Sequence, residues 1–172
     1  MIKTKYYAGI GSRKTPSEYL EFFSKLGRYL ENKGYILRSG GAKGADIAFE
    51  LKVNKSNKEI YLPWHGFEGN KSTLVVEKKE AFDIAKKYHP YWNNLKQGAR
   101  KLHARNSHQV LGLDLNTPSD FIICYTNKSG GTQQALRIAK DYNIPIFNCY
   151  GYKDIKECKI EFKKFISKFI EL

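Results

Sequence analysis

Short apolar runs alternate along this chain with longer segments in which apolar residues recur every three or four positions. The runs predict β-strands at residues 5–10, 35–38, 59–63, 121–125 and 145–149. The periodic segments predict helices at residues 16–33, 45–53, 77–88, 95–111, 131–142 and 154–170. Alternation of apolar strands and helices is typical of a parallel sheet that is covered on both faces. The pattern therefore predicts a single Rossmann-like α/β domain over residues 1–172, with a mostly parallel sheet.

The composition agrees with one folded domain. The chain has 172 residues, of which 41% are hydrophobic and 14% aromatic, as in globular proteins. No stretch is apolar for long enough to cross a membrane, and no signal region follows the basic N-terminus, so we expect a cytoplasmic protein without a membrane partner. The three cysteines and four histidines show no metal-ligand spacing. We therefore predict neither a metal site nor a cofactor.

The net charge is strongly positive. Thirty Lys and Arg residues stand against seventeen Asp and Glu residues, which gives a formal charge of +13. Such a surface favours polyanions, either single-stranded nucleic acid or nucleotides with several phosphates. A lysine-biased genome would produce the same excess, and charge alone does not decide between these interpretations.

Glycine-rich turns follow three of the predicted strands. Because the carboxyl ends of parallel strands meet at one edge of a sheet, we expect these turns to lie together, each before a helix. Backbone N–H groups at helix N-termini bind phosphate when no side chain blocks the approach. The turns predict a phosphate site made of Gly9, Gly11, Ser12, Arg13, Ser39, Gly40, Gly41, Ala42, Lys43, Gly44, Asp46, Ser129, Gly130, Gly131 and Thr132.

The same turns have a purely structural alternative, since a tight strand-to-helix connection often needs glycine for its geometry. If the glycines serve a ligand, valine at Gly41 or Gly44 is expected to abolish binding and to leave the fold intact. Two other nucleotide motifs are excluded. No Ser or Thr follows a Gly-Lys pair at the spacing of a Walker A loop, and Lys14 stands where a G-x-G-x-x-G fingerprint needs glycine.

Four segments of the chain, three of them in the glycine-rich turns, carry a family resemblance. Gly11-Ser12-Arg13, residues 39–46, Ala104-Arg105-Asn106 and residues 129–132 resemble the SLOG superfamily of Rossmann-like domains, and within it the Rossmann part of the DNA-processing protein A family. The resemblance covers most of residues 6–148. It adds Arg105 and Asn106 to the predicted site and implies a nucleotide or single-stranded DNA as ligand. Small stand-alone proteins of this kind occur in phages, which implies the host-cell cytoplasm as location.

The Lonely Guy phosphoribohydrolases belong to the same superfamily and imply a different activity. Their motif places a catalytic Glu where this chain has Ala135, and alanine can neither donate nor accept a proton. Asp46 and Glu50 are the nearest carboxylates in sequence, with helix capping or ion pairing as the alternative role. The resemblance therefore favours a protein that is not an enzyme.

Two aromatic segments have an undecided role. Trp64, which follows the third predicted strand, is assigned to the site as a platform on which a base stacks, with closure of the core as the alternative. Tyr91 and Trp92, after Pro90, pose the same question. Arg100 and His103 share one face of a predicted helix, where they contact either a phosphate or solvent.

The leading hypothesis is non-catalytic binding of a nucleotide or a nucleotide-derived signal, which a phage protein would use to sequester an immune signal. A single-stranded DNA-binding recombination mediator and a nucleotide N-glycosidic hydrolase are the alternatives. We expect a homo-oligomer, a dimer or higher. The apolar stripe of residues 154–170 either packs on the sheet or takes part in that interface.

Overall fold

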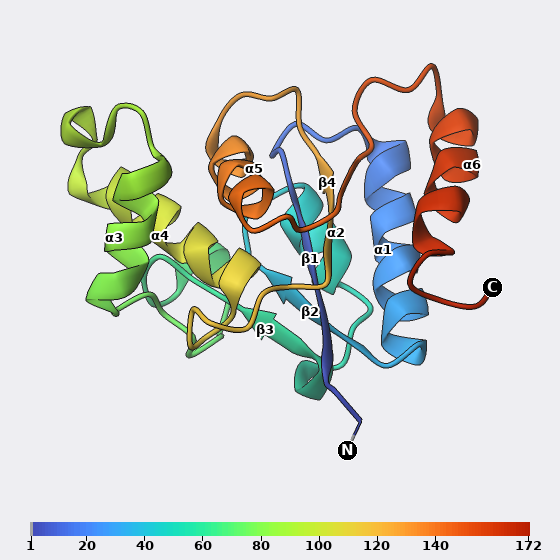
Figure 1. Ribbon diagram of the computed structural model, residues 1–172, viewed down its shortest axis with the longest axis horizontal. Helices are drawn as coiled ribbons and strands as arrows, with labels where there is room; N and C mark the ends of the chain where they lie inside the picture. The colour runs from blue at the N-terminus through green and yellow to red at the C-terminus, as the bar shows by residue number, and fades with distance from the viewer. Residues whose placement is uncertain (1) are drawn as a thin grey trace.

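The computed structural model describes residues 2–172 and confirms the predicted α/β fold. Its five strands form one sheet in the order β3-β2-β1-β4-β5, and every neighbouring pair is parallel. The strands are β1 (Lys5–Gly11), β2 (Tyr35–Ser39), β3 (Lys58–Ile60), β4 (Phe121–Tyr125) and β5 (Ile146–Asn148). Figure 1 shows the sheet in the middle of the molecule, with helices on either side.

Residues 2–172 also form six α-helices and three 3-10 turns, and all of them except the last helix, which follows β5, lie between strands. The helices are α1 (Ser17–Asn32), α2 (Ala45–Glu50), α3 (Lys79–Tyr88), α4 (Gln97–Leu111), α5 (Gly131–Asp141) and α6 (Ile155–Ile166). The 3-10 turns are η1 (Lys55–Asn57), η2 (Phe67–Gly69) and η3 (Trp92–Asn94). No helix within residues 2–172 is long and apolar enough to cross a membrane.

Besides α2, which stops at Glu50, two elements end three or four residues earlier than the pattern predicts. Strand β3 stops at Ile60 because the chain then leaves the sheet, and Leu62 pairs with Val75 in an isolated bridge. Helix α6 stops at Ile166, where the Phe169 N–H donates to the Ile166 carbonyl at 2.9 Å in a tighter turn. In both cases the apolar pattern runs past the end of the regular element, because residues after that end, such as Leu62 and Ile170, are still buried.

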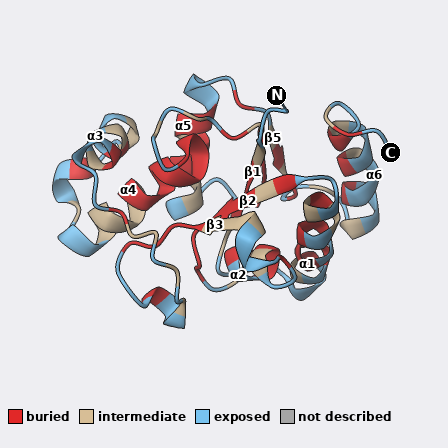
Figure 2. Cartoon of the chain, turned by 90° about the horizontal axis from the view of Figure 1, so that it is seen from below, coloured by how far each residue is buried: buried red, intermediate tan, exposed pale blue. Residues whose placement is uncertain are grey.

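The sheet is buried on both faces, which explains its uninterrupted apolar strands. Successive strand residues point to opposite faces. Tyr7 and Ile123 pack in one core with residues of α1, α2 and α6, while Ala8 and Ile122 pack in a second core with α4 and α5. All four side chains are fully buried. Helix α3 packs outside α4 around a third, smaller cluster, and Figure 2 shows its outer side exposed.

The aromatic side chains of the C-terminal helix α6 pack against α1 and β5 of the same chain. Phe162 meets Phe22 of α1 edge-on at 5.6 Å between ring centroids, and Phe165 lies 5.3 Å from Phe147 of β5. Asp154 caps the helix by accepting the Glu157 N–H at 2.9 Å. Phe162 and Phe165 of this stripe therefore pack within the chain, and a share of the helix in an interface between copies stays a prediction.

The strand order creates a crevice at one edge of the sheet. From β1 the chain builds outward through β2 and β3, then crosses back and builds outward on the other side through β4 and β5. The loops after β1 and β4 therefore run in opposite directions. In doubly wound sheets this switch point is where ligands bind.

Candidate functional site

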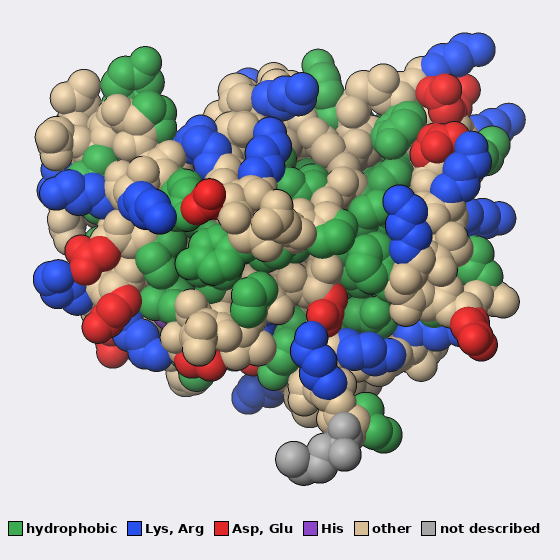
Figure 3. All heavy atoms as spheres, in the orientation of Figure 1, with side chains coloured by type: hydrophobic (Ala, Val, Ile, Leu, Met, Phe, Trp, Pro, Cys, Tyr) green, Lys and Arg blue, Asp and Glu red, His purple; other side chains and the backbone are tan. Residues whose placement is uncertain are grey.

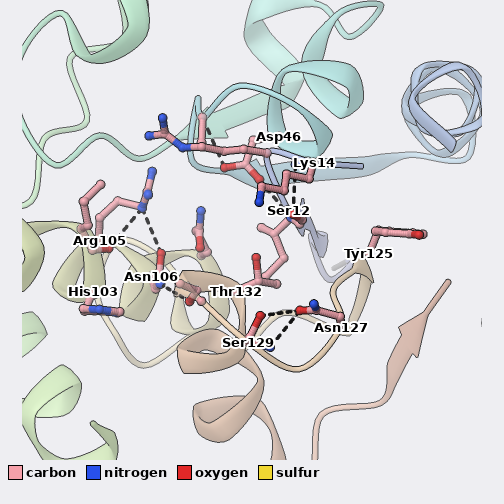
Figure 4. A pocket seen from close by; sticks show the side chains of 18 of the residues that line it. Ser12, Lys14, Asp46, His103, Arg105, Asn106, Tyr125, Asn127, Ser129 and Thr132 are labelled. Atoms are coloured by element: carbon pink, nitrogen blue, oxygen red, sulfur yellow. Dashed lines mark hydrogen bonds between the residues drawn. The ribbon is translucent and has the colours of Figure 1, made fainter. Parts of the chain in front are cut away.

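A pocket of about 580 Å³ occupies the crevice between β1 and β4. It is walled by the loops after these two strands, the N-terminus of α5, one face of α4 and a single turn of α2. Figure 4 shows side chains from these elements converging on it. The structure brings together eleven of the predicted site residues as its lining, namely Gly11, Ser12, Arg13, Ala42, Asp46, Arg105, Asn106, Ser129, Gly130, Gly131 and Thr132.

The other predicted site residues do not line the pocket. They are Gly9, Ser39, Gly40, Gly41, Lys43, Gly44 and Trp64. The Ser39 hydroxyl is buried and donates to the Gly9 carbonyl at 2.6 Å, so it holds β2 against β1. Trp64 packs edge-on against Phe67, with 5.3 Å between ring centroids. The turn after β2 therefore contributes less to the pocket than the other two turns.

The density of glycine in the turn after β2 has a packing explanation. Gly44 has a φ of +91°, and a Cβ there would lie 2.6 Å from the Ser12 carbonyl oxygen and 2.8 Å from the Arg13 Cα. A Cβ at Gly40 would overlap the side chains of Arg105 and Gln109. The segments that approach this backbone belong to the protein itself. The expectation that valine at Gly44 leaves the fold intact is therefore wrong, because the residue would clash with backbone atoms.

Asp46 occupies the N–H groups that the sequence assigns to a phosphate. Its carboxylate accepts the Gly11 N–H at 3.1 Å and the Ala42 N–H at 3.4 Å. Burial raises the pKa of Asp46 to about 6, against the opposing effect of the nearby Arg105. A carboxylate of the chain thus satisfies two backbone donors in the turns after β1 and β2, and these two N–H groups are not free for an external anion.

Arg105 and Asn106 form the back wall and tie two turns together. The buried Arg105 guanidinium donates to the carbonyls of Gly40 and Tyr61, and its Nε donates to Asn106 Oδ1 at 3.0 Å. The Asn106 Nδ2 then donates to the Gly131 carbonyl at 2.9 Å. These bonds connect the turn after β2 to the first turn of α5, and they orient the N-terminus of α5 relative to the pocket.

The N-terminus of α5 is open. Gly130 and Gly131 are exposed, and a Cβ added to either would meet no atom within 4 Å. Among the described residues no side chain caps this helix. The first backbone N–H groups of an α-helix have no partner within it, and they carry partial positive charge. This helix end therefore presents free donors to the pocket.

Cations lie at the mouth of the pocket. Arg13 and Lys14 line it and are exposed. Glu68, on η2, pairs with Arg13 at 3.4 Å and with Lys43 at 3.6 Å, although its own side chain is only 16% exposed. The mouth is thus positively charged, with one carboxylate held between two of the cations.

Sequence reasoning missed several lining residues, including Lys14, Gln109, Tyr125, Asn127 and Tyr150. Of the two residues weighed as phosphate contacts on one helix face, His103 lines the pocket and Arg100 does not. Leu102, Asn106 and Gln109 recur at spacings of four and three on α4, which is a signal for a shared face. The ring of Tyr150, after β5, meets Tyr125 edge-on at 5.6 Å, and no local pattern indicates this contact. Burial lowers the pKa of His103 to about 4, which leaves its imidazole neutral at pH 7.

Of the positions weighed for phosphoribohydrolase activity, Ala135 and Glu50 lie outside the pocket. Ala135 is fully buried in the core between α5 and the sheet. Glu50 pairs with Lys58 at 3.2 Å and accepts the Asn70 amide at 3.0 Å. Among the described lining residues Asp46 is the one carboxylate.

No family model matches this chain, and no curated protein matches it. The chain is similar to a solved structure of DNA processing protein A from Helicobacter pylori, with a TM-score of 0.61 and 21% sequence identity. That structure describes how the Helicobacter protein binds single-stranded DNA. The match covers 94% of this chain and 73% of the other. This chain therefore has a fold like that of DNA processing protein A.

Proposed function

We propose that this protein binds a nucleotide in the pocket between β1 and β4, with a phosphate at the N-terminus of α5. The observation that carries the proposal is the uncapped first turn of α5, open at Gly130 and Gly131, beside the cations Arg13 and Lys14. Free N–H donors and cations at one place favour a phosphate. The volume of about 580 Å³ lies within the range of small-molecule sites.

The rest of the lining suits a base and a sugar. Tyr125 and Tyr150 provide aromatic surface, and Asn106 and Gln109 provide amide groups. We propose a non-catalytic role because both oxygens of Asp46 already accept backbone N–H groups. Sequestration of a nucleotide-derived signal, as the SLOG resemblance suggests for a phage protein, is the form of this role that we favour.

Single-stranded DNA is the second candidate ligand. Two observations favour it, namely the fold shared with a protein that binds single-stranded DNA and the formal charge of +13. In this case the pocket holds one nucleotide of a longer strand, and surface lysines and arginines contact the neighbouring phosphates. Figure 3 shows such side chains spread over one face of the molecule.

Calorimetric titration separates the two ligands. We expect dTMP to bind and inorganic phosphate to compete with it, because both place a phosphate at α5. If a strand is the ligand, the ten-nucleotide strand dT10 binds more tightly than dTMP, and its log affinity falls against log salt by about 0.7 per phosphate contact. If the ligand is a free nucleotide, dT10 gains nothing over dTMP. The proposal fails if neither probe binds.

Glutamine in place of Glu68 is expected to raise the affinity for dTMP about two- to fivefold. The substitution releases Arg13 and Lys43 from their shared carboxylate. Both cations are exposed, and ion pairs at the protein surface are worth roughly 1 kcal/mol or less. Titration at low salt gives the largest difference, because salt screens exposed charges.

The matched control for that variant is Glu77→Gln, which removes the same charge from an exposed residue outside the pocket. We expect its effect on dTMP affinity to be much smaller. An equal gain in both variants would show that net charge matters and that release of Arg13 and Lys43 does not.

A further inference from the structure

A second hollow lies beside the pocket. It has a volume of about 350 Å³ and is formed by the end of α3, the following loop and η3. Its lining residues are Lys86, His89, Pro90, Tyr91, Trp92, Asn93 and Asn94. Figure 3 shows a notch in the edge of the molecule between the lobe that carries α3 and the part that carries α5.

The two hollows share a wall. His103 of α4 lines the first pocket, and His89 lines the second hollow. Their rings are in contact, with 4.4 Å between centroids. Arg100, one turn before His103, lies over the Trp92 ring at 5.4 Å and donates to the Trp92 carbonyl at 3.3 Å. One helix face and one pair of imidazoles therefore separate the two volumes.

This wall carries polar atoms that the protein does not use. His103 Nδ1 and Arg100 Nε are buried, and neither has a hydrogen-bond partner among the described residues. A buried polar atom without a partner is costly, so the packing of this wall leaves two polar groups unsatisfied. Burial lowers the pKa of both His89 and His103, so these rings are neutral at pH 7 and suit the edge or face of an uncharged base.

The second hollow also presents an aromatic ring to solvent. Tyr91 is 68% exposed, whereas the next residue, Trp92, is buried. The Tyr91 N–H donates to His89 Nδ1 at 3.1 Å, which holds the loop against the histidine. Lys86 lies in the same lining. In proteins that bind single strands, bases stack on exposed aromatic rings and nearby cations contact the phosphates.

We infer that the second hollow binds the base of a nucleotide next to the one held at α5, with Tyr91 as its stacking platform. The ligand class is then a single-stranded DNA segment of at least two nucleotides. This inference rests on the proposed function, because the first nucleotide must occupy the pocket. It develops the second candidate ligand, in which the pocket holds one nucleotide of a longer strand.

The test compares dTMP with the tetranucleotide dT4 in calorimetric titrations. In the unmodified protein we expect dT4 to bind more tightly than dTMP. Tyr91→Ala is expected to weaken dT4 about tenfold and to leave dTMP unchanged, since stacking is base-tolerant and the pocket is untouched. Tyr91→Phe, which keeps the ring, should bind both ligands like the unmodified protein.

Tyr142→Ala is the matched control, because Tyr142 is 44% exposed and lies at the far end of α5. We expect it to change neither affinity. The inference is overturned if dT4 binds no more tightly than dTMP, if Tyr91→Ala leaves dT4 unchanged, or if it weakens dTMP equally. The first of these results leaves the proposed pocket intact, whereas absence of dTMP binding refutes both.

Discussion

Aspartate in place of Gly131 is expected to lower the affinity for dTMP about 100-fold, or about 2.8 kcal/mol, with little change in stability. Gly131 lies at the first position of α5 and lines the pocket, and a Cβ added there would meet no atom within 4 Å. A carboxylate there repels the phosphate and competes for the same N–H groups. Like charges in contact cost several kcal/mol.

The fold should tolerate this change. Gly131 does not have a positive φ, and an acidic residue in the first turn of a helix is favourable. We expect the melting temperature to stay within about 3 °C, which corresponds to roughly 1 kcal/mol for a protein of this size.

The control is Gly131→Ala, which adds the Cβ without the charge. We expect it to weaken dTMP much less than aspartate does, as measured by calorimetry. Aspartate at Gly131 with unchanged dTMP affinity in a folded protein would place the phosphate somewhere other than the N-terminus of α5.

Alanine in place of Gly44 is expected to destabilise the protein by about 2–6 kcal/mol. The backbone there (φ 91°, ψ −127°) lies in a region that is costly for any side chain, by about 1–3 kcal/mol. The added Cβ would also lie within 3 Å of the Ser12 and Arg13 backbone, and overpacking costs about 1–3 kcal/mol more.

Gly130→Ala isolates the packing contribution. Gly130 has a similar backbone conformation (φ 74°, ψ −164°), but a Cβ there meets nothing within 4 Å. We expect Gly130→Ala to lower the free energy of unfolding by only the backbone-conformation contribution, about 1–3 kcal/mol. Urea denaturation measures both variants. Equal losses would mean that the close approach of the Ser12–Arg13 backbone does not limit position 44.

Much of the fold could be read from local pattern. Apolar runs and helical periodicity each depend on neighbours a few positions away, and they located the strands and helices to within a few residues. The turns after β1 and before α5 were predicted to lie at one sheet edge, because all carboxyl ends of parallel strands meet there. Both turns line the pocket.

The sequence by itself determined an α/β chain with glycine-rich turns at one edge of a parallel sheet. Only the tertiary structure decided which backbone donors remain free. Asp46 reaches Gly11 across 35 positions, and Arg105 reaches Gly40 across 65. These contacts depend on strand order and on how α4 packs, neither of which leaves a periodic signal. The physical reason is that each strand edge and helix end needs partners from distant segments. Asp46 and Arg105 were named as site residues from the sequence, but nothing local indicated which backbone groups they would bind.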